Sequence, residues 1–125
     1  MKRWVVHART ELVARHALSF RGVVESSHEH CWIIAIRVGT DHLSHEGITI
    51  DFELLSTLLR NRLQHIDHSD LNQHPEIGSP SPTAERFAEV VASRLGPEVE
   101  GLKATLLSVS IWEGPDNQVD LNLAQ

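Results

Sequence analysis

The chain has 125 residues and 41% hydrophobic content, which suits a single domain over residues 1–125 with a modest core. Its net charge of −6 disfavours general nucleic-acid binding, which needs a basic face, and no apolar run is long enough for a membrane span or a signal peptide. The single cysteine, Cys31, excludes an intrachain disulfide and fits a reducing compartment, so we expect a cytoplasmic protein.

Two long segments near the start of the chain alternate apolar and polar side chains, which is the pattern of a half-buried strand. The first covers about residues 3–19, and one parity contains Trp4, Val6, Ala8, Leu12, Ala14, His16 and Leu18. The second runs from about His28 to Val38, and one parity contains His28, His30, Trp32, Ile34, Ile36 and Val38. Phe20–Gly22 predicts a turn or short loop between them, so the two strands can form a hairpin.

Two amphipathic helices are expected next, after a polar connection. Asp51 is a good N-cap residue, and the leucines that follow it have helical spacing: Leu54, Leu55, Leu58, Leu59 and Leu63. A loop-rich segment then leads to a second helix that Ser81 or Thr83 can cap. The apolar stripe of this helix contains Ala84, Phe87, Ala88, Val91 and Leu95. Gly96–Pro97 predicts its end, since proline cannot continue a helix.

Two further strands complete the chain, over about residues 102–113 and 119–123, with a turn at residues 114–117. The order ββααββ predicts an α+β fold, an antiparallel four-stranded sheet with two helices on one face. Such a sheet leaves open edges, which a small domain rarely tolerates. Joining sheets edge to edge across subunits would satisfy these edges.

Three histidines on the first two strands form a candidate metal site. His28 and His30 are separated by one residue, so on a strand both imidazoles project to the same side. The hairpin can bring His16 opposite this pair. Three imidazoles that converge on one point make a zinc site with a vacant fourth position, as in catalytic zinc centres. The alternative is that they are three of nine histidines scattered over the surface of a His-rich protein.

Short motifs along nearly the whole chain resemble, in order, those of the 6-pyruvoyltetrahydropterin synthase / 6-carboxytetrahydropterin synthase family. They are Ala14-Arg15-His16-Ala17-Leu18, His28-Glu29-His30, Asp51-Phe52, Asp67-His68-x-x-Leu71-Asn72, Pro82-Thr83-x-Glu85 and Trp112-Glu113. The resemblance implies the tunnelling fold (T-fold), in which trimers close a barrel and stack into hexamers, with active sites at subunit interfaces. It also implies a homo-oligomer with a small-molecule pterin substrate and with Zn²⁺ held by the three histidines.

Two positions depart from the family pattern. Glu29 stands where the family has a glycine between the metal histidines, and Val24 stands where it has a catalytic cysteine. Cys31 does not replace that cysteine, because it follows the histidine pair and has the opposite parity. Glu25 resembles a family subgroup with the motif Glu-x-x-His-Gly-His, in which a glutamate takes the place of the thiol.

The resemblance also assigns chemical roles to residues outside the metal site. Asp67 and His68 resemble a catalytic pair in which the carboxylate fixes the imidazole tautomer and raises its basicity, with a turn role in a loop as the alternative. Glu25 is a second candidate acid or base, with an exposed loop carboxylate as the alternative. Glu113 resembles the pterin anchor, since a carboxylate accepts two parallel hydrogen bonds from a 2-amino-pyrimidinone edge. Thr83 is expected to add substrate contacts.

These residues predict a zinc-dependent carbon–oxygen or carbon–carbon lyase that acts on 7,8-dihydroneopterin triphosphate or a close relative. With glutamate in place of cysteine, side-chain cleavage to 6-hydroxymethyl-dihydropterin fits as well as triphosphate elimination or 6-carboxytetrahydropterin formation. The main alternative is a non-catalytic family member that binds zinc and a pterin or purine. A third reading is a metal-free aldolase of the dihydroneopterin type.

Overall fold

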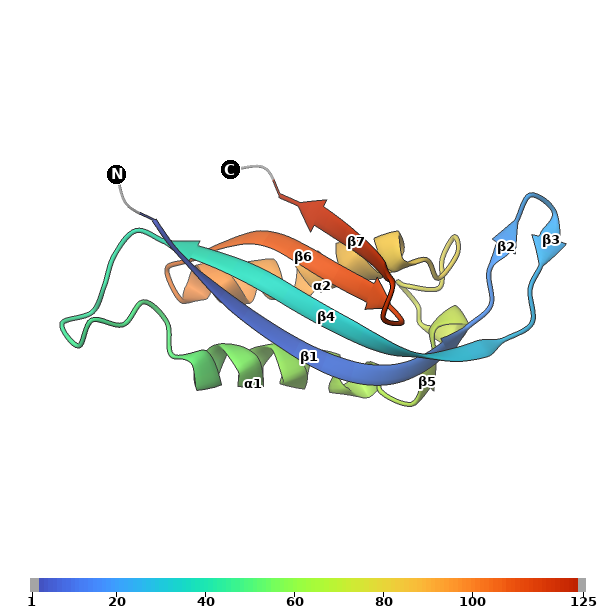
Figure 1. Cartoon of the computed structure of the whole chain (residues 1–125), viewed down its shortest axis with the longest axis horizontal. Coiled ribbons are helices and arrows are strands. Elements are labelled where there is room, and N and C mark those ends of the chain that lie inside the picture. The colour runs from blue at the N-terminus through green and yellow to red at the C-terminus, as the bar shows by residue number, and fades with distance from the viewer. Residues whose placement is uncertain (1–2, 124–125) are drawn as a thin grey trace.

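A curved sheet built on two long strands dominates the molecule, whose computed structural model describes residues 3–123 (Figure 1). The strands β1 (Trp4–His16) and β4 (His28–Thr40) pair antiparallel along their whole lengths. Beyond β4 the sheet continues with β6 (Thr105–Glu113) and β7 (Asn117–Asn122), each again antiparallel to its neighbour. These four strands are the ones that the sequence predicted.

The sheet nevertheless has five strands and not the expected four. A short strand, β5 (Ser69–Asp70), pairs parallel with the edge of β1, so the sheet is mixed, in the order β5-β1-β4-β6-β7. Two residues are too few for any alternation to show in a sequence. The first strand also ends at His16, earlier than expected, and a separate small hairpin of β2 (Ser19–Phe20) and β3 (Val23–Val24) follows it.

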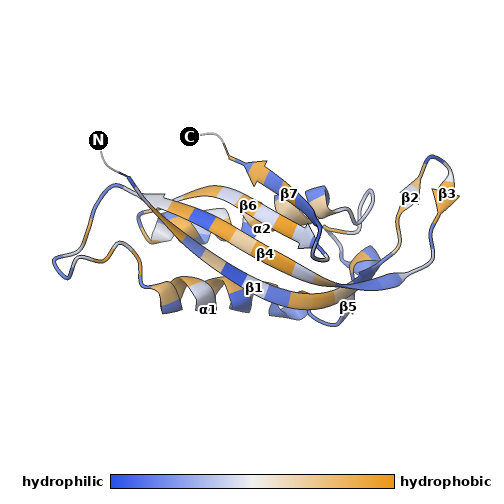
Figure 2. Cartoon of the chain, viewed as in Figure 1, coloured by the Kyte–Doolittle hydropathy of each residue, from blue (hydrophilic) through white to orange (hydrophobic). Residues whose placement is uncertain are grey.

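The alternation along the two long strands decides which side chains face the core. Hydrophobic and hydrophilic residues alternate along β1 and β4 in Figure 2, and the buried positions follow the parity predicted from the sequence. The strand register places His16 opposite His28 and Ala14 opposite His30. Because directly opposite residues share a face, all three histidines lie on the face that carries the core.

The first helix, α1 (Phe52–Leu63), begins after Asp51, whose Oδ1 accepts a hydrogen bond from the backbone N–H of Glu53 at 2.9 Å. This contact confirms Asp51 as the N-cap. Leu54 was expected in the buried stripe, but it is half exposed. It precedes the first buried residue by one position, which rotates it by about 100° away from the buried face of the helix. The residues of α1 that are buried are Leu55, Leu59 and Leu63.

The second helix, α2 (Ala84–Gly101), is capped by Thr83, whose hydroxyl accepts a hydrogen bond from a first-turn N–H at 3.0 Å. The prediction that the helix ends at Gly96–Pro97 is wrong, because the helix continues past this proline. The proline removes one backbone donor, but the extra turn places Val99 fully in the core, which offsets the loss. After the helix ends, Lys103 takes the left-handed conformation, with φ at 61°.

Both helices pack on the face of the sheet that carries the histidines. The helix α1 lies against β1, and α2 lies against β6 and β7. Trp32 of β4 and Phe87 of α2 are fully buried with ring centroids 5.5 Å apart, which fixes the start of α2 next to the histidine end of β4. Within residues 3–123, no helix combines the length and the apolar character of a membrane span.

Candidate metal centre

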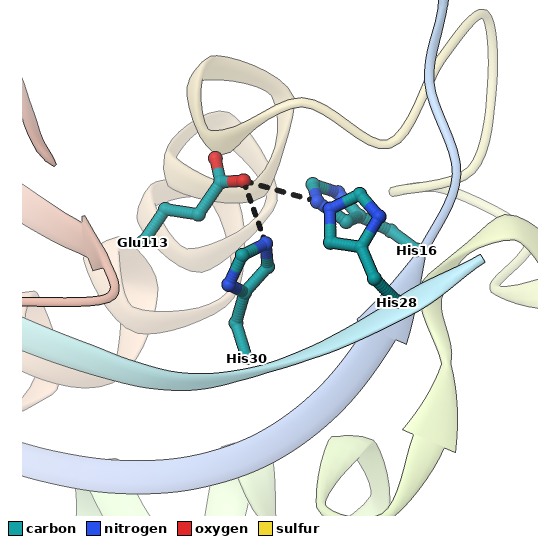
Figure 3. A group of neighbouring side chains, drawn as sticks. All are labelled: His16, His28, His30 and Glu113. Atoms are coloured by element: carbon teal, nitrogen blue, oxygen red, sulfur yellow. Dashed lines mark hydrogen bonds and ion pairs between the residues drawn. The ribbon is translucent and has the colours of Figure 1, made fainter. Parts of the chain in front are cut away.

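Four side chains point toward one another at one end of the sheet (Figure 3). They are His16 from β1, His28 and His30 from β4, and Glu113 from the end of β6. One ligand atom from each lies within 4.8 Å of the others. Imidazole nitrogens and a carboxylate oxygen are the donors that zinc and related divalent ions take in proteins.

The backbone explains why these residues meet. His16 and His28 are direct cross-strand partners, and His30 lies two positions along β4 on the same face. In the next pair of strands Glu113 is the direct partner of Trp32, which shares the parity of the two β4 histidines. The carboxylate is therefore one strand away from the imidazoles and on their face of the sheet.

Backbone carbonyls set the tautomers of two of the histidines. His16 Nδ1 lies 2.9 Å from Pro82 O, and His28 Nδ1 lies 3.0 Å from Ser26 O. Because a carbonyl only accepts, each Nδ1 carries the proton and each Nε2 of a neutral ring keeps a lone pair, as in metal-ligating histidines. His16 Nε2 also lies 3.1 Å from Glu113 Oε1. A cation between these two atoms would satisfy both of them.

The Nε2 atom of His30 is the clearest sign that a ligand belongs here. It is buried and makes no hydrogen bond to any residue between 3 and 123, although it lies 3.0 Å from Glu113 Oε1. Buried polar atoms nearly always have a partner. Burial lowers the pKa of His30, an effect that Glu113 opposes and that the charges of His16 and His28 reinforce. The neutral ring, which is the form that binds a metal, is thereby favoured.

Trp32 holds the cluster in place from the core side. Its Nε1–H donates to Ala14 O at 3.1 Å, and its ring meets those of His16 and His30 edge-on at centroid distances of 5.1 and 5.6 Å. Both Trp32 and His16 are fully buried. The packed indole restricts rotation of the two imidazoles, so their donor atoms converge without help from an ion.

The sequence comparison assigns the chain to a family. The model of the family described as 6-pyruvoyl tetrahydropterin synthase matches residues 5–123. The chain belongs to the 6-pyruvoyl tetrahydropterin synthase family. Among curated proteins, none matches it.

Solved structures of 6-pyruvoyl tetrahydropterin synthases share the fold. The Caenorhabditis elegans protein is 17% identical, with a TM-score of 0.83 over 99% of this chain and 98% of that chain. The Plasmodium vivax protein is 15% identical, with a TM-score of 0.76 over 98% and 100%. A Plasmodium vivax variant in which a catalytic glutamate is replaced by alanine is 14% identical, with a TM-score of 0.72 over 98% and 100%. These matches establish the T-fold for this chain.

Glu25, one of the residues selected from the sequence, lies beside the metal centre. Its Oε1 is 3.8 Å from His28 Nε2 and accepts a hydrogen bond from the backbone N–H of Leu18 at 2.8 Å. The N–H of Glu25 in turn donates to Leu18 O at 3.0 Å. The carboxylate is therefore held at the His28 side of the cluster by the base of the β2–β3 hairpin.

Asp67 and His68 are not part of the histidine cluster of their own chain. Neither makes a hydrogen bond or ion pair with the four clustered residues in the described part of the chain. Asp67 Oδ1 accepts from the N–H of Val13 at 2.9 Å, and the N–H of His68 donates to Val13 O at 2.6 Å. Their side chains meet at 3.7 Å, between Asp67 Oδ2 and His68 Nε2, and that of His68 is 76% exposed. Both residues thus fasten the edge of β1.

Glu113 and Thr83 were both selected from the sequence for substrate binding. The hydroxyl of Thr83 caps α2, and the preceding carbonyl, Pro82 O, is the one that faces His16. Glu113 lies within the histidine cluster, a position that sequence reasoning missed. The register between β4 and β6 would have revealed it, but a helix-containing connection separates these strands in the sequence and leaves their register open.

Proposed function

We propose that this protein is a zinc-dependent pterin lyase acting on 7,8-dihydroneopterin triphosphate or a close relative. The observation that carries the proposal is the convergence of three imidazoles with preset tautomers and one buried, unbonded Nε2. Membership in the 6-pyruvoyl tetrahydropterin synthase family supplies the substrate class. A zinc ion held by neutral imidazoles would act as a Lewis acid on an oxygen of the substrate side chain.

Glu25 is the residue that we propose to move a proton at this centre. Its carboxylate is fixed by the Leu18 N–H and lies next to His28, where it can reach a side chain bound at the cluster. The position where the family has its catalytic cysteine is occupied by Val24, and Cys31 lies elsewhere in the sequence, so no thiol is present at that position. The catalytic glutamate named in the Plasmodium vivax protein supports a carboxylate in such a role.

Asp67 and His68 are proposed to complete the site of a neighbouring copy. Both are exposed at the β1 edge, where β5 covers only the end of the strand, and they are not bonded to the cluster of their own chain. A subunit that joined its sheet to this edge would bring its own metal centre within reach of the pair. We therefore propose a homo-oligomer, a trimer or hexamer, with active sites between subunits.

Glu113 and Thr83 are proposed to hold the pterin ring. A carboxylate can accept two parallel hydrogen bonds from the ring N–H and the exocyclic amino group of a 2-amino-pyrimidinone. Glu113 is the partly exposed carboxylate at the mouth of the cluster, so the ring would place its side chain over the imidazoles. Thr83 starts α2 next to the Pro82 carbonyl that orients His16.

The test is incubation of zinc-loaded protein with 7,8-dihydroneopterin triphosphate, with products identified by mass spectrometry. A 6-pyruvoyl product, a 6-carboxy product and 6-hydroxymethyl-dihydropterin differ in mass, so one run distinguishes triphosphate elimination from side-chain cleavage. Absence of turnover with zinc, and with other divalent ions, would contradict the lyase proposal.

The second candidate is a family member that binds zinc and a pterin or purine without turnover. Val24 at the cysteine position and Glu29 between the histidines favour it. The variants Glu25→Ala and His68→Ala discriminate between the two. A lyase loses turnover in both variants while it keeps zinc, whereas a binding protein keeps its ligand affinity.

A further inference from the structure

We propose that Glu113 is exchanged between the metal and the pterin ring. It is the fourth donor to the metal when substrate is absent, and it leaves the metal when the ring takes up the carboxylate. This inference rests on the proposed function, because it assigns two successive partners to one carboxylate of that site. The exchange determines when the metal has an open coordination position for the substrate. The three histidines alone do not determine this, and neither does a carboxylate that only binds the pterin.

The position of the carboxylate is that of a ligand. Glu113 Oε1 lies 3.1 Å from His16 Nε2 and 3.0 Å from His30 Nε2, and one oxygen makes both contacts. Donors on a tetrahedral zinc ion, with bonds of about 2.0–2.1 Å, lie roughly 3.3 Å apart. The two distances are within a few tenths of an ångström of that spacing, as expected for an oxygen that needs only a small adjustment to share an ion with both rings.

The surrounding backbone allows the carboxylate to move while its strand stays fixed. Glu113 is held as the cross-strand partner of Trp32, and the N–H of Gly114 points to Cys31 O at 3.4 Å. The side chain is 26% exposed, so rotation about its own bonds carries the carboxylate between the cluster and solvent. Exchange therefore requires a change of rotamer, which is fast, and no rearrangement of the sheet.

The chemistry makes the two roles of Glu113 exclusive. A site of three imidazoles and one carboxylate has four protein ligands and is closed, whereas catalytic zinc needs an open position. A pterin edge offers the carboxylate two parallel N–H donors, which compete with the metal for the same oxygens. Ring binding would then open a coordination position just as the substrate side chain arrives. Compounds that carry the side-chain hydroxyls without the ring would leave the centre closed.

Cobalt substitution gives a direct test, because the visible absorption of Co²⁺ depends on its coordination number and donor atoms. The Co²⁺-loaded wild-type protein is compared with Glu113→Gln, Glu113→Ala and the control Glu29→Gln, whose exposed carboxylate lies on the other face of β4. We expect both Glu113 variants to change the spectrum and to weaken zinc binding by about 10-fold or more, measured by chelator competition. Glu29→Gln should change neither quantity.

The second half of the test uses unsubstituted pterin, which has the ring edge but no side chain, and glycerol, which has only hydroxyls. Pterin should change the Co²⁺ spectrum of the wild-type protein and leave that of Glu113→Gln unchanged, and glycerol should affect neither. If the Glu113 variants keep the wild-type spectrum and affinity, or if pterin leaves the wild-type spectrum unchanged, the exchange is refuted while the lyase proposal stands. If no variant or wild-type protein binds Co²⁺ or zinc, both proposals fail together.

Discussion

Asn72 holds the backbone of Ala17 with both ends of its side-chain amide. Its Oδ1 accepts from the N–H of Ala17 at 2.8 Å, and its Nδ2 donates to Ala17 O at 2.9 Å. Ala17 directly follows His16, so the amide continues the edge pairing that β5 gives to the end of β1. The backbone that carries a fully buried histidine of the candidate metal centre is therefore fixed by a side chain 55 residues later in the chain.

The first prediction concerns Asn72→Asp, which keeps the shape of the side chain but replaces its donor with an oxygen that faces Ala17 O. We expect the free energy of unfolding to fall by about 1–3 kcal/mol, because a carbonyl loses its partner and meets an acceptor. Zinc affinity should fall by about 10-fold, since the support of a ligand is lost. Urea unfolding and chelator competition measure the two effects.

Asn61→Asp is the control for the added negative charge, because Asn61 is exposed on α1 and, unlike Asn72, makes no hydrogen bond to Ala17 in the described part of the chain. It should leave zinc affinity unchanged. Equal losses of zinc affinity in the two variants would mean that net charge, and not the amide contact with Ala17, governs the site.

The second prediction tests whether Asp67 and His68 serve a neighbouring subunit. His68→Ala and His28→Ala should each be inactive alone, because one lacks the proposed base and the other a proposed metal ligand. Mixed oligomers refolded from equal amounts should recover about a quarter of wild-type activity. Half of the metal centres and half of the Asp67–His68 pairs are then intact, so random mixing unites two intact halves in about a quarter of the sites.

The matched control for this mixture is His68→Ala with Asp67→Asn. These variants damage the same half of the proposed site, so their mixed oligomers should stay as inactive as the parents. If the first mixture is no more active than this control, the pair does not complete a neighbouring site.

The histidine cluster shows how far the sequence could lead. His16, His28 and His30 could be placed on one face because a period of two along long strands leaves little choice once the apolar parity is known. The same parity allows the register that pairs His16 with His28, but a shift of two residues would keep it as well, so the exact pairing is known only from the structure. Glu113 could not be placed, since β6 comes after both helices and its pairing with β4 shifts by a bulge between Arg37 and Val38.

The elements that sequence reasoning missed depend on tertiary contacts. The β5 strand exists because side chains and N–H groups around it bond to the edge of β1, and no local pattern records this. The second helix passes Pro97 because Val99 is buried, which outweighs the local preference to stop. Asp67 was selected for chemistry, and its contact with Val13 became visible only when the two segments lay side by side.

The third prediction compares a glycine of the turn segment before α2 with a glycine in the last turn of α2. A Cβ at Gly78 would lie 2.5 Å from Asn72 O and 2.8 Å from Leu71 O and His74 O, all of them backbone atoms that cannot move alone. Gly78→Ala should therefore lower the free energy of unfolding by about 1–3 kcal/mol. It should also weaken zinc binding, because the displaced segment contains Asn72.

Gly101→Ala is the counterpart, because Gly101 lies in the last turn of α2 and is not followed by a proline. Apart from its two chain neighbours and its own helix backbone, no atom lies within 4 Å of a Cβ at this position. It should raise the free energy of unfolding by about 0.5–1 kcal/mol, the usual gain when alanine replaces glycine in a helix. Urea unfolding measures both variants. A change of the same sign in the two proteins would contradict the steric argument at Gly78.

The fourth prediction concerns two histidines away from the metal centre. His74 Nδ1 accepts from the backbone N–H groups of Glu76 and Ile77 at 3.2 and 3.1 Å, so the proton of the neutral ring is on Nε2, which lies 3.3 Å from His65 Nε2. Burial lowers the pKa of both His65 and His74, the nearby Arg94 guanidinium lowers both further, and Glu76 opposes these effects. Protonation of His74 at Nδ1 would also break its two bonds to the backbone.

The sign of the pH effect follows from these lowered pKa values. Below the ordinary histidine pKa of about 6.5 the unfolded chain binds protons that the folded chain does not, so stability falls as the pH drops. His74→Asn keeps an acceptor for the two N–H groups and removes the titrating ring. The loss of unfolding free energy between about pH 7.5 and about pH 5.5 should therefore be smaller in His74→Asn than in the wild-type protein.

Urea unfolding at the two pH values measures this difference, with His45→Asn as the control for removal of an exposed loop histidine. The variants must be compared with the wild-type protein, because burial also lowers the pKa of His30. Acid therefore lowers the free energy of unfolding through His30 in every variant. If His74→Asn and His45→Asn lose the same free energy on acidification as the wild-type protein, the His65–His74 pair does not contribute to acid sensitivity. If His74→Asn and His45→Asn reduce the acid-induced loss of unfolding free energy equally, removal of any histidine has this effect. The hydrogen bonds from the backbone of residues 76–77 to His74 would then not explain the acid sensitivity.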